Sequence, residues 1–242
     1  EATSDKTRIV IGGSHGKTTI TAMILHVMHF HKIETDFLVG AQLEGFNTMV
    51  NFSNTSKYAV IEGDEYLASP IDRRPKFHLY KPNIAIISGI AWDHINVFPT
   101  FENYIEQFEK FIELIEPNGH LIYCSKDENL NKIANKTYTQ LKTKEGYEVP
   151  NHTIENGVTY LKVENKKVPL LIFGNHNLMN LNGAKIVCNK IGINDEQFYE
   201  AIQSFKGEEK RLELVFKNET FNFYKDFAHS PSKLKAINEA VK

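Results

Sequence analysis

The sequence predicts an α/β protein with a mostly parallel sheet, helices on both faces and a small antiparallel edge. Short apolar runs alternate along the chain with segments whose apolar residues recur at helical spacing. Strands that alternate with helices form parallel sheets covered on both faces. A glycine-rich turn also joins the first expected strand to the first expected helix. Ligands bind beyond the carboxyl ends of the strands in such sheets, so we expect functional residues directly after the strands.

Four of the expected strands are short, apolar and part of the parallel sheet. They comprise residues 8–11, 58–61, 84–87 and 121–124. Residues 158–163 and 168–172 flank a polar turn and predict a hairpin at a sheet edge. An edge position suits Pro169 because proline has no amide proton to donate to a neighbouring strand.

The expected helices each have one apolar face. The first carries Ile20, Met23, Ile24, Val27 and Met28, which recur at helical spacing. The second carries its apolar residues between positions 101 and 115 and ends at a Pro-Asn-Gly sequence. Two more helices are expected near 177–191 and 195–205, and residues 231–242 predict a last one.

The composition argues against several classes of protein. The 242 residues correspond to one or two domains, and a formal net charge of −2 with no basic block argues against a nucleic-acid partner. No apolar run approaches the ~18 residues of a membrane span, so we expect no membrane partner. Cys124 and Cys188 lie among apolar residues, as buried thiols do in a reducing compartment. We therefore expect a cytoplasmic protein, and its oligomeric state stays open.

The glycine-rich turn has the sequence of a phosphate-binding loop, Gly-Gly-Ser-His-Gly-Lys-Thr-Thr over residues 12–19. Glycines let backbone N–H groups face a phosphate, and the following helix adds the positive end of its dipole. In this pattern Lys17 reaches the β- and γ-phosphates and Thr18 binds Mg²⁺. The spacing is shorter than the usual Gly-x-x-x-x-Gly-Lys-[Ser/Thr], and a plain glycine turn is the alternative. His15 either contacts phosphate or only shapes the loop. The expected nucleotide-binding residues here are Gly13, Ser14, His15, Gly16, Lys17, Thr18 and Thr19.

Acidic residues and a histidine follow the next two strands of the expected sheet. Glu62 opens the run Glu-Gly-Asp-Glu after residues 58–61, and Asp93-His94 comes after residues 84–87. Carboxylate oxygens at a strand end suit Mg²⁺, which takes one or two carboxylates and keeps several waters. The alternatives are an acidic surface turn and a histidine that caps a helix or lies hydrogen-bonded in the core. The expected metal ligands are Thr18, Glu62 and His94.

In order and spacing these motifs resemble those of the Mur ligases, and three later stretches extend the resemblance. Residues 174–180 resemble the family's Gly-x-His-Asn-x-x-Asn segment, which contacts adenine. Residues 207–213 resemble its Gly-x-x-x-Arg-Arg-Phe-Glu turn, whose arginine approaches the ATP phosphates. Residues 226–231 resemble the Asp-Tyr-Ala-His-x-Pro that opens its C-terminal domain. The resemblance implies an ATP-binding central domain at 1–214 and the beginning of a truncated C-terminal domain at 215–242. The further nucleotide contacts that it implies are His176, Asn177, Asn180, Arg211 and Asp226.

The resemblance implies an ATP-dependent ligase of peptidoglycan synthesis that forms an amide bond through an acyl phosphate. ATP and Mg²⁺ are the implied cofactors, and UDP-N-acetylmuramate with an amino acid or short peptide are the implied partners. The acidic run and the histidine of the phosphate loop resemble the branch that acts on UDP-N-acetylmuramate, and we expect L-alanine to be added. Residues 66–80 are similar to the branch that attaches a recycled tripeptide, which stays open as an alternative. The implied catalytic residues are Lys17, Glu62, His94 and Arg211.

The chain departs from the family pattern, and two further functions compete with the ligase. Where the family has Asn-x-Glu-x-Asp-His, Gly89 and Ala91 replace the Asn and the Glu. The family's N-terminal UDP-binding domain is missing, so we expect little ligase activity from these 242 residues alone. A folylpolyglutamate-synthase-like ligase is one alternative, against which the acidic run and residues 174–180 argue. A nucleotide-binding switch module is the other, although the chain has no Asn-Lys-x-Asp motif for reading guanine.

Overall fold

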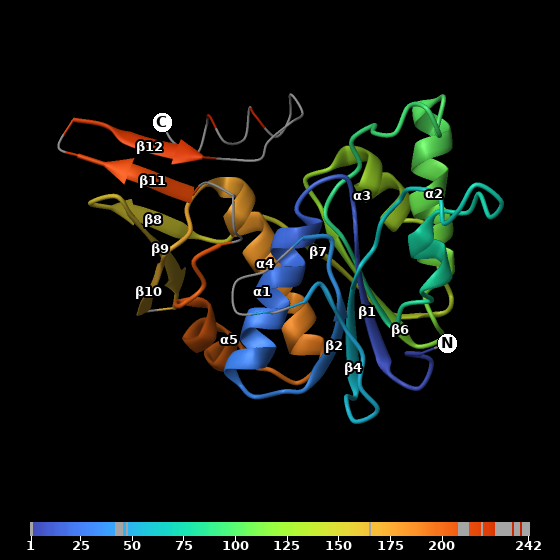
Figure 1. Ribbon diagram of the computed structural model, residues 1–242, viewed down its shortest axis with the longest axis horizontal. Coiled ribbons are helices and arrows are strands. Elements are labelled where there is room, and N and C mark those ends of the chain that lie inside the picture. Colours follow the sequence, from blue (N-terminus) through green and yellow to red (C-terminus); the bar gives the residue numbers. More distant parts are fainter. Residues whose placement is uncertain are drawn as a thin grey trace.

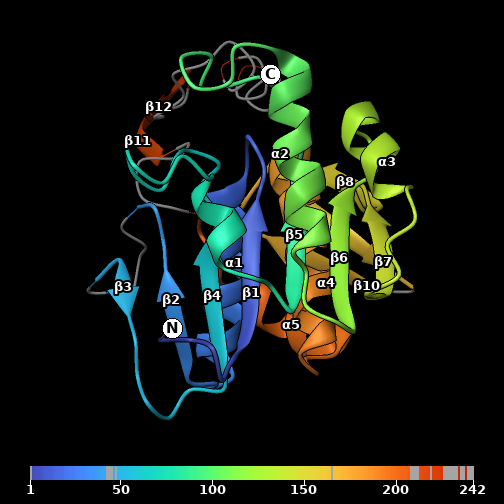
Figure 2. The same cartoon turned by 90° about the vertical axis from the view of Figure 1, so that its right-hand side faces the viewer.

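The computed structural model describes residues 2–41, 46, 48–164, 166–207, 213–218, 220–225, 234 and 238. A seven-stranded sheet with the order β3-β2-β4-β1-β5-β6-β7 forms its centre (Figure 2). All neighbouring strands in it are parallel except β3, which runs antiparallel to β2. The strands are β1 (Thr7–Gly12), β2 (Thr35–Leu38), β3 (Val50–Asn51), β4 (Tyr58–Glu62), β5 (Ile84–Ile87), β6 (Gly119–Cys124) and β7 (Leu141–Tyr147).

Helices cover both faces of this sheet, which confirms the predicted fold class. On one face lie α1 (Lys17–Phe30), α4 (Asn175–Lys190) and α5 (Asp195–Ile202), and α1 packs against the other two (Figure 1). The other face carries α2 (Phe101–Glu113) and α3 (Glu128–Ala134), together with the 3₁₀ turn η1 (Lys76–Leu79).

The sheet is buried because it is covered on both sides. Ile9, Val10 and Ile11 of β1 have no exposed surface, although their side chains point alternately to the two faces. Beneath α2, the ring of Phe77 stacks on that of Phe111 at 4.5 Å between centroids. The continuous apolar runs that predicted the central strands thus reflect burial on both faces.

The hairpin expected at a sheet edge lies in a separate antiparallel sheet with the order β10-β9-β8, whereas the antiparallel edge strand of the main sheet is β3. The predicted hairpin is confirmed as β9 (Val158–Val163) and β10 (Lys166–Leu170), and Pro169 lies in an edge strand. The third strand, β8 (His152–Glu155), pairs with β9.

A two-stranded hairpin follows, formed by β11 (Glu213–Lys217) and β12 (Asn222–Lys225). β11 begins two residues before position 215, where the C-terminal domain is expected to begin. The position of this domain boundary stays a prediction. The helix expected at 231–242 falls almost entirely outside the described residues. Among the helices that the structure describes, none is both long and apolar enough to cross a membrane.

Candidate nucleotide site at the carboxyl edge of the sheet

The loop after β1 turns tightly into α1 and is braced by the neighbouring loop after β5. The Ser14 amide donates to the Gly89 carbonyl at 3.0 Å, and the hydroxyl of Ser88 donates to the His15 carbonyl. Gly16 caps α1 with a φ of +76°, a conformation that side chains disfavour. A Cβ on Gly16 would lie 3.0 Å from Asn180 Cγ and closer still to its Oδ1. Glycine at position 16 therefore lets Asn180, in the second turn of α4, approach the loop.

Lys17 points back across this loop instead of into solvent. Its Nζ donates to the Gly13 carbonyl at 2.7 Å and to Glu65 Oε2 at 2.7 Å. Glu65 follows β4 and is only 1% exposed, so its charge depends on such partners. The ammonium that the sequence assigned to phosphate binding is thus paired with a buried carboxylate.

Thr18 and Glu62 also meet, as their expected roles as metal ligands require. The Thr18 hydroxyl donates to Glu62 Oε1 at 2.9 Å, and the amide of Gly40 donates to Glu62 Oε2 at 2.8 Å. Glu62 ends β4, the strand paired with β1, so the sheet itself places the two side chains together.

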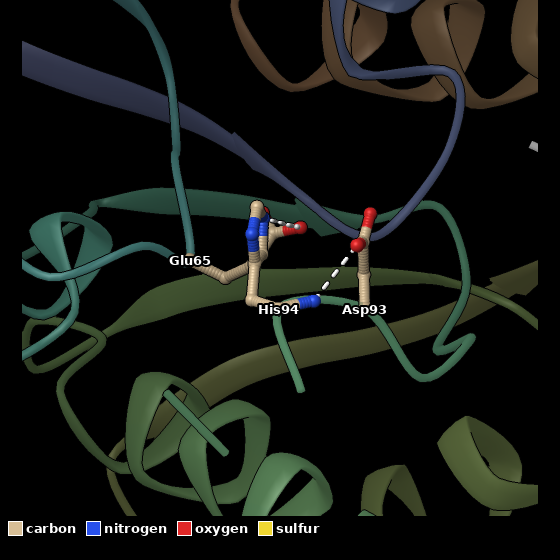
Figure 3. Close-up of side chains that lie close together, drawn as sticks. All are labelled: Glu65, Asp93 and His94. Atoms are coloured by element: carbon tan, nitrogen blue, oxygen red, sulfur yellow. Dashed lines mark hydrogen bonds and ion pairs between the residues drawn. The ribbon is translucent and has the colours of Figure 1, made fainter. Parts of the chain in front are cut away.

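Figure 3 shows a third group, in which Glu65 faces the two residues expected after β5. Glu65, Asp93 and His94 place one ligand atom each within 4.8 Å of one another. His94 Nε2 lies 3.8 Å from Glu65 Oε1, and the His94 amide donates to Asp93 Oδ1 at 2.7 Å. His94 has a φ of +55°, and its ring packs edge-on against Tyr66 at 5.0 Å. Glu65 therefore links Lys17 to His94.

The other acid of the run, Asp64, points away from this group. Its Oδ2 accepts from Lys76 Nζ at 2.7 Å. Although partial burial opposes ionisation, the hydrogen bonds from Lys76 and the Tyr66 amide, together with the charge of Lys76, outweigh it and lower the pKa of Asp64. Of the four residues Glu-Gly-Asp-Glu, the first and the last thus face the phosphate loop.

The remaining predicted residues fall into three groups. Thr19 lies in the first turn of α1, and Asn180 lies buried against the loop. His176 and Asn177 lie in the first turn of α4, where Asn177 Nδ2 donates to the Phe173 carbonyl at 2.9 Å. Arg211 and Asp226 lie outside the described residues, so their expected contacts stay predictions.

The structure adds two residues to the predicted set, Glu65 and Tyr104. The acidic run pointed to the first in general terms, because it follows a strand that ends at the phosphate loop. Tyr104 belongs to the apolar residues of the helix expected between positions 101 and 115, and it is fully buried. Its hydroxyl lies 3.2 Å from Glu65 Oε1 and 2.9 Å from Ser14 Oγ.

Neither cysteine belongs to this site. Burial raises the pKa of the Cys188 thiol, which has no exposed surface. Burial also raises the pKa of Cys124, whose Sγ contacts Met179 Sδ at 3.7 Å. Neither thiol is poised as a nucleophile.

Comparisons with known proteins agree with this geometry. Residues 11–188 match the family described as the Mur ligase middle domain. A UDP-N-acetylmuramate–L-alanine ligase of Phocaeicola vulgatus is 30% identical over 94% of this chain and 50% of its own length. The crystal structure of UDP-N-acetylmuramate–alanine ligase from Thermotoga maritima superposes with a TM-score of 0.75 at 22% identity, over 98% of this chain and 54% of that one. UDP-N-acetylmuramate:L-alanyl-γ-D-glutamyl-meso-diaminopimelate ligase from Neisseria meningitidis gives a TM-score of 0.71 at 23% identity, over 84% and 67%.

The matched region covers most of the chain and carries a phosphate-binding loop on a doubly covered parallel sheet. The chain belongs to the Mur ligase family. The part of the family that it matches is the middle domain, and the chain spans about half the length of the curated relatives.

Proposed function

We propose that this chain supplies the ATP-binding centre of a cytoplasmic ligase that joins L-alanine to UDP-N-acetylmuramate in peptidoglycan synthesis. One observation supports the proposal: beyond the carboxyl ends of β1, β4 and β5, Lys17 contacts Glu65, Glu65 lies beside His94, and Thr18 contacts Glu62. A ligase that activates a carboxylate with ATP must bring two anions together, and these residues supply cations and metal ligands for that purpose.

In the proposed reaction, a carboxylate oxygen of the sugar nucleotide attacks the γ-phosphorus of ATP. The bond between the γ-phosphorus and the bridging oxygen breaks, and ADP leaves with that oxygen. The amine of the second substrate then attacks the carbonyl carbon of the acyl phosphate, loses a proton and displaces inorganic phosphate. Lys17 would exchange Glu65 for phosphate oxygens and stabilise the charge of the group in transfer. No side-chain nucleophile is required.

The donor atoms present fit a divalent metal ion. Thr18 and Glu62 offer a hydroxyl and a carboxylate that already meet, and both are hard oxygen ligands of the kind that Mg²⁺ selects. Glu65, Asp93 and His94 offer a second set. One Mg²⁺ held by Thr18 and Glu62, and a second metal ion held by His94, would neutralise phosphate charge.

The test uses the full-length protein that contains this chain. We expect ATP-dependent release of phosphate when UDP-N-acetylmuramate and L-alanine are both present, and none when either is omitted. The Lys17→Ala variant should abolish this activity, whereas Lys57→Ala should retain it because Lys57 is exposed and precedes β4 at the opposite end of the sheet. Turnover of a folate with glutamate, or affinity for GTP equal to that for ATP, would contradict the proposal.

A recycled acidic tripeptide is the second candidate for the amine substrate, and one observation favours it. The loop from Leu67 to Pro75, which are bridged to each other, leaves the site and presents the exposed side chains of Arg73 and Arg74. Asp72 accepts a hydrogen bond from Arg74 at 2.7 Å, and no interaction of Arg73 is described. An acidic tripeptide offers such cations more carboxylates than L-alanine does. Phosphate release with L-Ala-γ-D-Glu-meso-diaminopimelate, and none with L-alanine, would support the second candidate.

A further inference from the structure

We propose that Tyr104 is a positioning residue of this centre, which acts by holding Glu65 between Lys17 and His94. The inference rests on the proposed function. Two loops meet at the Tyr104 hydroxyl: Ser14 comes from the loop after β1 and Glu65 from the loop after β4. Ala91, from the loop after β5, joins them through Ser14. No part of the predicted chemistry uses this hydroxyl.

The contacts form a continuous chain of hydrogen bonds. The Ala91 amide donates to Ser14 Oγ at 2.9 Å, and Ser14 Oγ lies 2.9 Å from the Tyr104 hydroxyl. The Tyr104 hydroxyl in turn donates to Glu65 Oε1 at 3.2 Å. Glu65 Oε2 accepts a hydrogen bond from Lys17 Nζ at 2.7 Å, so the two carboxylate oxygens have different partners.

The charge of Glu65 determines which group donates in each of these hydrogen bonds. A carboxylate is a stronger acceptor than a hydroxyl, so the single proton of Tyr104 goes to Glu65. A phenol is protonated at neutral pH, so Tyr104 remains a donor. The single proton of Ser14 is then free for Tyr104 or for the Ala91 carbonyl, which lies 2.8 Å away.

The position of Tyr104 is fixed by α2. Thr100 caps this helix by accepting from the Asn103 amide at 3.2 Å, and Tyr104 lies in the first turn. Its ring packs between Phe98 and Phe108, at 5.4 Å and 5.2 Å between centroids. The hydroxyl is therefore held rigidly at the carboxyl edge of the sheet, where it can orient a buried carboxylate.

Loss of the Tyr104 hydroxyl would affect Lys17 and His94 together, because Glu65 contacts both. Without the hydroxyl, Glu65 keeps its burial but loses a donor, and its Oε1 is no longer fixed at 3.8 Å from His94 Nε2 (Figure 3). Misplacement of catalytic groups lowers the rate of the chemical step more than it weakens substrate binding. Tyr104 should therefore affect kcat chiefly through Glu65.

The test is a double-mutant cycle in the full-length protein, followed by phosphate release. Tyr104→Phe keeps the ring and should lower kcat about 10-fold, as expected for one hydrogen bond to a charged group, with KM for ATP changed less than about 3-fold. In a Glu65→Ala background, which removes the acceptor of the Tyr104 hydroxyl, the same substitution should change kcat less than about 2-fold. The matched control is Tyr138→Phe, which removes a hydroxyl that donates to the Ile133 carbonyl at 3.1 Å and should leave kcat unchanged.

The outcomes are distinct. If Tyr104→Phe lowers kcat by the same factor with and without Glu65, or no more than Tyr138→Phe does, the positioning role is refuted while the proposed function stands. If the wild-type protein releases no phosphate from ATP with either amine, the proposed function fails and this inference fails with it. Melting temperatures of all variants, measured in parallel, show that each is folded in the assay.

Discussion

The approach of α4 to the phosphate loop at Gly16 leads to a prediction whose size can be worked out from the structure. In Gly16→Ala, an L-residue is forced to a φ of +76°, which costs about 1–2 kcal/mol. The new Cβ would also lie 3.0 Å from Asn180 Cγ and closer to Oδ1, and overpacking of this kind costs about 1–3 kcal/mol more. We expect a total loss of about 2–5 kcal/mol of unfolding free energy.

Gly157 provides a matched control because it separates the two contributions. It has a φ of +78° in the turn between β8 and β9, and a Cβ there would meet nothing within 4 Å. Gly157→Ala should therefore show only the conformational cost of about 1–2 kcal/mol. Urea unfolding of the 242-residue chain, followed by the fluorescence of its single tryptophan, Trp92, measures both losses. Asn180→Ala should reduce the cost of Gly16→Ala. Equal losses in the two glycine variants, or no relief from Asn180→Ala, would refute the close packing of α4 on the loop.

Three further predictions concern the site and the stability of the chain. Lys17→Ala should weaken binding of an ATP analogue at least about 10-fold in calorimetric titration, since one charge-assisted contact is worth about 1.5–3 kcal/mol, and unchanged affinity would refute the loop assignment. Glu62→Gln should reduce the Mg²⁺-dependent part of nucleotide affinity, and an equal loss without Mg²⁺ would contradict its role as a ligand. Burial lowers the pKa of His78 below its usual 6.5, so the unfolded chain binds more protons below that pH and stability should fall as the pH drops through 6.5. Because His78→Gln removes this proton uptake, the difference between urea midpoints at pH 5 and pH 7.5 should shrink in that variant; an unchanged difference would assign the effect to other groups.

The central strands could be predicted because they are buried on both faces, which leaves a continuous apolar signal. The strands that were missed carry polar residues for specific reasons. In β2, Asp36 has no exposed surface, and its carboxylate pairs with Lys6. In β7, an edge strand of the sheet, half-buried and exposed positions alternate, only Tyr147 is buried, and three of the seven residues are charged. β8 could have been found from the Asn156-Gly157 turn, where both residues have the positive φ typical of two-residue hairpins.

The location of the site could be predicted from the sequence, but the contacts between its side chains could not. Strand ends and motif spacing placed Lys17, Thr18 and Glu62 at one edge of the sheet, as observed. The choice between Asp64 and Glu65 depends on backbone geometry after β4, which turns the first toward Lys76 and the second toward Lys17. Periodicity assigns a residue to the buried face of a helix, but it does not reveal what a tyrosine hydroxyl meets there.

The central claim is that Lys17 exchanges a buried carboxylate for the phosphates of a nucleotide bound at the carboxyl edge of the sheet. A crystal structure of the full-length protein with Mg²⁺ and a non-hydrolysable ATP analogue tests it most directly. The account predicts phosphate oxygens within hydrogen-bond distance of Lys17 Nζ and a metal ion on Thr18 and Glu62. A nucleotide bound elsewhere, with Lys17 still paired to Glu65, would contradict it.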